Sequence, residues 1–100
     1  ELLIITAVQL FEKDIKQLLK KSGVSAFSYT NVTGYKDQSD QPRNPIGLPL
    51  ILGEYASVLF YAFVQKELID DVTSAIDKLK ASQESLSRVH VVVLDIKKMN

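Results

Sequence analysis

The sequence lacks cysteine and tryptophan, has a single histidine, and carries no net charge, with twelve basic and twelve acidic side chains. Without cysteine, the chain has no disulfide framework, thiolate zinc site or cysteine nucleophile. The balanced charge argues against a dedicated nucleic-acid binder, whose affinity depends mainly on neutralising phosphates. No apolar run approaches the about 20 residues of a membrane-spanning helix, and no signal peptide is recognised. We therefore expect a soluble, cytoplasmic protein.

The length of 100 residues and the apolar fraction of 46% fit one globular domain. A chain of this size buries about 65% of its unfolded surface on folding, which is enough for one core without covalent staples. No internal repeat, low-complexity tract or linker divides the sequence. We expect residues 1–100 to form a single domain.

Two segments, 10–21 and 66–81, have apolar residues at helical spacing. In both, acidic side chains lie near the start and lysines near the end, an arrangement that the helix dipole favours. Gly23 follows the first segment as a C-terminal cap. The apolar stripes are Phe11, Ile15, Leu18 and Leu19 in the first helix, and Leu68, Val72, Ala75, Ile76 and Leu79 in the second.

Four segments read as strands: 2–8, 24–35, 54–64 and 88–97. Together with the helices they give the order βαββαβ, the ferredoxin-like α+β pattern. It predicts a four-stranded antiparallel sheet with both helices on one face. The first, third and fourth strands are apolar on both sides. Because an exposed apolar sheet face usually marks an interface, we expect an oligomer in which the sheets pack against each other.

The segment 37–53, between the second and third strands, contains all three prolines, which exclude a long helix. Irregular segments of this length are usually functional or disordered in compact domains. A solvated segment is the simplest interpretation of its charges, and a recognition loop is the alternative. For the latter, the partner-binding residues would be Asp37, Asp40, Arg43, Ile46 and Leu48.

No arrangement of side chains indicates catalysis or a metal site. His90 lies inside the last strand and is interpreted as a packing residue. The acidic residues of the second helix are explained by its N-terminus, and no glycine-rich phosphate motif is present. Of the four tyrosines, Tyr29 and Tyr61 are interpreted as packing residues, and Tyr35 and Tyr55 as anchors of the loop. We predict no catalytic residue and no metal ligand, and hence no enzyme. A small enzyme of the dimeric α+β barrel type would have only His90 as a candidate.

The segment 26–38, Ala-Phe-Ser-Tyr-Thr-Asn-Val-Thr-Gly-Tyr-Lys-Asp-Gln, resembles the second strand and T-loop entry of PII signalling proteins. That family typically has Gly-[hydrophobic]-Thr-x-[Thr/Ser]-x-Val-x-Gly-[aromatic]-Gly-Arg-Gln there. The other predicted elements follow the PII order and spacing over nearly the whole chain, with Asp95 in the place of the aspartate of the family's final core strand. The resemblance implies a homotrimer of ferredoxin-like subunits, with adenine-nucleotide clefts between subunits and a T-loop, here 37–53, that docks on transporters or enzymes.

The resemblance also implies ligand-binding positions. Ser28 matches a hydroxyl residue near the adenine, Gly34 the glycine that ends the second strand, and Gln38 the glutamine at the loop base. Lys36 and Arg88 are the cationic candidates beside them.

The sequence departs from the family at its phosphate-binding positions. Lys36 and Asp37 replace a Gly-Arg pair, and an acidic residue there would repel phosphate. Residues 82–88 replace the family's B-loop and contain no glycine, which disfavours an anion-binding backbone nest. We therefore assign no cofactor. An adenine nucleotide is the only candidate, and these departures from the family count against it.

The sequence thus predicts a PII-like homotrimeric regulator that senses a small effector at subunit clefts. It would dock through its T-loop on a membrane transporter or another target protein, and associate with a membrane only through such a partner. The alternative is a CutA-like trimer for divalent-metal tolerance. The absence of cysteine and the single histidine count against that alternative.

Overall fold

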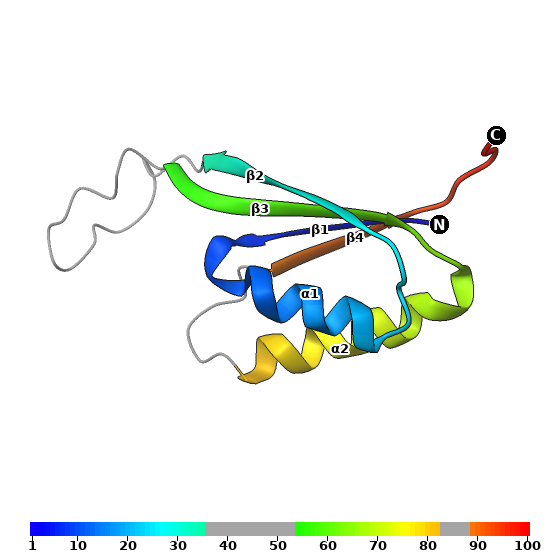
Figure 1. The fold of residues 1–100 in the computed structure, drawn as a ribbon, viewed down its shortest axis with the longest axis horizontal. Helices are drawn as coiled ribbons and strands as arrows, with labels where there is room; N and C mark the ends of the chain where they lie inside the picture. Colours follow the sequence, from blue (N-terminus) through cyan, green and yellow to red (C-terminus); the bar gives the residue numbers. More distant parts are fainter. Residues whose placement is uncertain (36–53, 83–88) are drawn as a thin grey trace, which may run out of the picture.

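A computed structural model describes residues 1–35, 54–82 and 89–100 of the chain (Figure 1). Four strands and two α-helices alternate as the sequence predicts, with a short 3-10 turn before the first helix. The elements are β1 (Leu2–Val8), η1 (Gln9–Phe11), α1 (Glu12–Lys21), β2 (Ser28–Tyr35), β3 (Glu54–Phe63), α2 (Lys66–Ser82) and β4 (Val89–Leu94).

The strands form one antiparallel sheet in the order β2-β3-β1-β4. Both helices lie against one face of this sheet, and no helix of residues 1–35, 54–82 or 89–100 lies against the opposite face (Figure 1). This arrangement confirms the ferredoxin-like α+β fold, in which each helix crosses between two parallel, non-adjacent strands.

The hydrophobic core lies between the sheet and the helices. Every second residue of β1 is buried, so one side of that strand faces the core. Side chains of α1 and α2 cover this side because the apolar stripes of both helices point toward the sheet. Fully buried members include Leu3, Ile5, Val58 and Phe60 from the strands, with Ile15, Leu19, Val72 and Ile76 from the helices.

Some predicted boundaries are wrong. Residues 24–27 do not belong to β2, which begins only at Ser28, because this stretch links the helix layer to the sheet edge. The last strand ends at Leu94, opposite Leu2 at the start of β1, and not at residue 97. Residues 10 and 11 belong to η1 rather than to the helix. The second helix runs one residue further than predicted, to Ser82.

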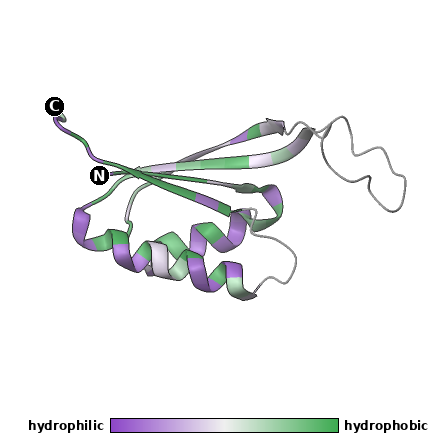
Figure 2. Ribbon diagram, turned by 180° about the vertical axis from the view of Figure 1, so that it is seen from behind, coloured by the Kyte–Doolittle hydropathy of each residue, from purple (hydrophilic) through white to green (hydrophobic). Residues whose placement is uncertain are grey.

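The face of the sheet away from the helices, here called the open face, is largely apolar. The pairing register places sixteen residues of the four strands on it, and none is Asp, Glu, Lys or Arg. Figure 2 shows hydrophobic residues along these strands, whereas hydrophilic ones recur along the helices. The most exposed large apolar side chains of the open face are Phe63 (58%), Val92 (49%), Leu94 (47%) and Tyr61 (42%).

His90 also lies on the open face, opposite Thr6, and its side chain is exposed. Its interpretation as a packed residue is therefore wrong for this chain. The reason is that no helix of the described residues covers the open face, so that even side chains of the inner strand β3, such as Tyr61 and Phe63, are exposed there.

Candidate functional site

A gap opens in the sheet where β2 and β3 separate. Their last pair is Ser28 with Tyr61, yet β3 continues to Phe63. The separation begins at the end of α1, where Gly23 takes a φ of +92° and the Val24 N–H donates to the Leu19 carbonyl at 3.0 Å. Residues 24–27 are thereby tied to the helix layer at one end and join the sheet edge only at the other.

The main chain of Phe63 faces this gap. Glu1 and Val64 exchange two hydrogen bonds, of 3.1 and 2.9 Å. In an antiparallel pair of strands, residue pairs that exchange two hydrogen bonds alternate with pairs whose N–H and C=O groups point away from the partner strand. Phe63 belongs to a pair of the second kind, so its N–H and C=O point away from β1. Within the described residues β2 does not pair with Phe63. One donor and one acceptor, side by side, are thus available to a ligand.

Two cavities are lined by the edges of the gap. One of about 230 Å³ lies among Ala26, Phe27, Ser28, Tyr61, Ala62 and Phe63. Another of about 310 Å³ lies among Gly23, Val24, Ser25, Ala26, Phe63, Val64, Gln65 and Leu68. Both include Ala26 and Phe63, so the two cavities adjoin. Aromatic rings, backbone polar groups and the Ser28 hydroxyl are the features by which a planar heterocycle is commonly held.

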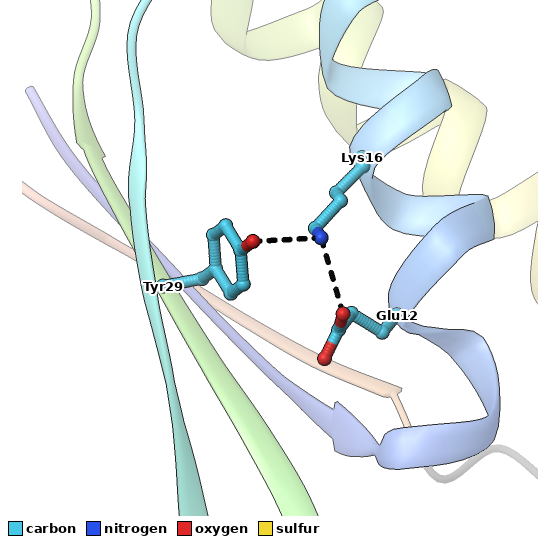
Figure 3. Close-up of polar contacts among 3 residues, drawn as sticks. All are labelled: Glu12, Lys16 and Tyr29. Carbon is cyan, nitrogen blue, oxygen red and sulfur yellow. Dashed lines mark hydrogen bonds and ion pairs between the residues drawn. The ribbon is translucent and has the colours of Figure 1, made fainter.

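A polar contact between α1 and β2 lies next to the gap (Figure 3). The Lys16 ammonium donates to the Tyr29 phenol oxygen at 2.8 Å and to the Glu12 carboxylate at 3.1 Å. The same nitrogen lies 4.0 Å from the centre of the Tyr29 ring. The hydrogen bond to Tyr29, with that to Glu12, raises the pKa of Lys16 above its ordinary value of 10.5. This lysine is therefore charged throughout the physiological range of pH.

The structure separates the two described residues that the sequence predicts as ligand-binding. Ser28 begins β2 and lines the smaller cavity, whereas Gly34 lies near the other end of the strand. Six residues of extended chain span roughly 20 Å, so the two residues lie near opposite ends of β2. The predicted ligand residues Lys36, Gln38 and Arg88 lie outside the described residues. So do the loop 37–53 and its partner-binding residues Asp37, Asp40, Arg43, Ile46 and Leu48.

Sequence reasoning missed the gap itself. The site predicted from the sequence does not include Ala26, Phe27 or Phe63. The sequence indicates Tyr61 as a packing residue, whereas in the structure it lines the smaller cavity. A main-chain site leaves little trace in side-chain types. The available signal was positional: Gly23 caps a helix immediately before residues that had to return to the sheet edge.

Other kinds of site find no support in the described parts of the chain. No group of three or more His, Asp or Glu side chains lies close enough together there to hold a metal ion. Among the helices that the structure describes, none is both long and apolar enough to span a membrane.

Known proteins resemble this chain in structure and not detectably in sequence. No family model matches the sequence, and neither does any curated protein. Among solved structures, CPII, a nitrogen regulatory PII-like protein from Thiomonas intermedia K12 bound to ADP, AMP and bicarbonate, is 16% identical with a TM-score of 0.63. The match covers 99% of this chain and 93% of CPII.

Two further structures agree with this comparison. The apo form of CPII is 18% identical with a TM-score of 0.66, over 95% of this chain and 86% of that protein. GlnK from B. subtilis is 20% identical with a TM-score of 0.63, over 91% of this chain and 81% of that protein. The matches extend over nearly the whole of this chain and most of each neighbour, so the protein has the fold of the PII-like proteins.

Proposed function

We propose that this protein is a PII-like regulatory protein whose single domain senses a small effector in the gap between β2 and β3. The observation that carries the proposal is that the N–H and C=O of Phe63 point away from β1, beside two adjoining cavities, and pair with no other described residue. A nucleobase edge presents a donor next to an acceptor, which complements this pair. The structural neighbour CPII is bound to ADP, AMP and bicarbonate, which makes these three compounds the first to test.

The recognition that we propose depends on the base rather than on the phosphates. The cavities of the gap are lined by apolar, aromatic and neutral polar residues. The sequence also lacks the glycines that would build a phosphate nest in residues 82–88. We therefore expect adenosine and AMP to bind about as well as ADP or ATP.

We further propose that the protein is a homotrimer in which the open faces of three sheets pack together. Sixteen positions without a carboxylate, ammonium or guanidinium group make a face that water solvates poorly. In such an assembly a second subunit could complete the cleft beside the gap, and Gly34 of one subunit could approach Ser28 of the next. Docking of the 37–53 loop on a membrane transporter or other target protein is the proposed output.

Isothermal titration with adenosine, AMP, ADP, ATP and bicarbonate tests the effector proposal. Ala26→Leu places a larger side chain in both cavities and should abolish binding. Ala81→Leu, on the exposed surface of α2, is the matched control and should bind like the wild type. Unchanged binding by Ala26→Leu, or no binding of any of these compounds to the wild type, would overturn this assignment. A more than tenfold preference for ATP over AMP would show that the phosphates carry recognition.

Titration with copper and zinc tests the alternative of a metal-tolerance protein. The described residues contain no cluster of three or more metal ligands. Titration of either metal in the same experiment should give only weak, non-stoichiometric heat.

A further inference from the structure

The gap described above adjoins a cluster of three aromatic rings. Phe27, which lines the smaller cavity, packs against Tyr29 with ring centres 6.4 Å apart and against Phe60 at 5.9 Å. Tyr29 and Phe60 are 5.4 Å apart. Phe60 is fully buried in the core and therefore provides a fixed base for the other two rings. A movement of Tyr29 should therefore displace Phe27, which forms part of the cavity wall.

Tyr29 is itself held from the other side by helix α1. As Figure 3 shows, the Lys16 side chain reaches from the helix to the tyrosine, with its ammonium beside the phenol oxygen and Glu12. The Tyr29 side chain is 47% exposed, so packing alone leaves it considerable freedom. Among the hydrogen bonds between described side chains, the one from Lys16 to Tyr29 joins a helix to β2.

We infer that Lys16 is a positioning residue for the effector site: through Tyr29 and Phe27 it fixes where β2 leaves β3, and hence the width of the gap. This inference rests on the proposed function. The Lys16 hydrogen bond restrains Tyr29, the second residue of β2, and the ring contact passes that restraint to Phe27. Ordering the wall before a ligand arrives lowers the entropic cost of binding. Loss of the lysine should therefore weaken effector binding without unfolding the core.

The inference can be tested without a ligand, because the restraint on Tyr29 also affects the hydrogen bonds between β2 and β3 in the free protein. Hydrogen-bonded pairs alternate along β3, so Tyr61 pairs with Ser28 and Leu59 pairs with Thr30, the two hydrogen-bonded pairs nearest the gap. In Lys16→Met, amide hydrogen exchange at Ser28 and Thr30 should accelerate about fivefold, and the amides of β1 should not change. Lys13→Met, which removes an exposed lysine of the same helix, is the matched control.

Three variants separate positioning from general stability. Lys16→Arg keeps a cationic donor and should restore most of the protection, while Tyr29→Phe removes the acceptor and should behave like Lys16→Met. Unchanged exchange in Lys16→Met, or equal acceleration at every core amide, would overturn the inference. AMP is the probe for the second measurement, and its affinity should fall about fivefold in Lys16→Met and stay constant in Lys13→Met.

Failure of the two proposals can be told apart. If AMP does not bind the wild type but exchange at Ser28 and Thr30 responds as expected, the effector assignment is wrong and the control of the gap by Lys16 stands. If AMP binds the wild type and Lys16→Met with equal affinity, the positioning role is wrong whatever the exchange rates.

Discussion

The ring of Tyr55 lies across the backbone of Gly34, its partner on the neighbouring strand. A Cβ atom built on Gly34 would be 2.4 Å from two atoms of that ring and 2.8 Å from the phenol oxygen. The backbone of Gly34 does not have a positive φ, so the glycine is needed here for space and not for its dihedral angles. The structure thus gives a packing reason for this glycine, and the ligand role that the resemblance to PII proteins implies stays a prediction.

Gly34→Ala should therefore act through Tyr55. The new methyl group displaces the Tyr55 ring, which is 38% exposed, at a cost of about 1–2 kcal/mol of stability. The alanine also restricts the unfolded chain, which contributes about 0.4–1 kcal/mol in its favour. We expect a small net destabilisation in the wild type and a stabilisation in the Tyr55→Ala background, measured by urea unfolding. Equal effects in both backgrounds would show that the two residues are not coupled.

Gly23 differs from Gly34 because its constraint is conformational. Its φ is +92°, and a Cβ there would meet Leu68 only at an ordinary 3.5 Å. Gly23→Ala should thus destabilise the protein by about 1–2 kcal/mol, the cost of a left-handed alanine. Gly23→Asn should cost less, since asparagine tolerates this region better. Thermal unfolding of the two variants checks the order, and an alanine variant as stable as the wild type would contradict it.

Val92→Asp tests the proposed assembly. It places a carboxylate on the open face, where a second subunit would bury it without a partner. Self-association, measured by sedimentation velocity, should weaken by at least about a hundredfold while the circular dichroism stays unchanged. Asn31→Asp, exposed on the opposite face of the sheet, is the control and should leave assembly intact. A wild type that is monomeric at micromolar concentration would refute the trimer outright.

The raised pKa of Lys16 predicts how its contribution depends on pH. Because the folded state holds this proton more tightly than the unfolded chain, the contribution is complete below pH 10.5 and is lost as the pH rises through the folded pKa. The difference in urea midpoint between wild type and Lys16→Met should therefore be constant from pH 6 to 9 and shrink above pH 10.5. A difference that varies between pH 6 and 9 would implicate another titrating group.

Much of the fold followed from local patterns. The stripes containing Ile15 and Val72 predicted both helices, because one face of each helix is buried in the core. The short run of Leu, Ile and Val in 2–8 predicted β1 to the residue. The start of β2 was predicted too early. Residues 24–27 have strand-like composition, but their path is set by the tertiary demand of leaving the helix layer, which local propensity cannot express.

The candidate site was less accessible to sequence reasoning. Ser28 was predicted through the resemblance and does line the cavity, while Phe63 contributes main-chain groups that any residue but proline possesses. The contact of Lys16 with Tyr29 joins residues thirteen positions apart on two elements, a pairing that no periodicity encodes. Both features become visible only when the register of the sheet is known.

The amide of Phe63 offers the most direct measurement of the central claim, that a small effector binds in the gap between β2 and β3. In an NMR titration with AMP, its proton should shift downfield as it donates to the base, together with the signals of Ala26 and Ser28. The signals of exposed α2 residues such as Asp77 should stay in place. A titration that leaves the Phe63 amide unmoved, or that moves only signals far from the gap, would contradict the account.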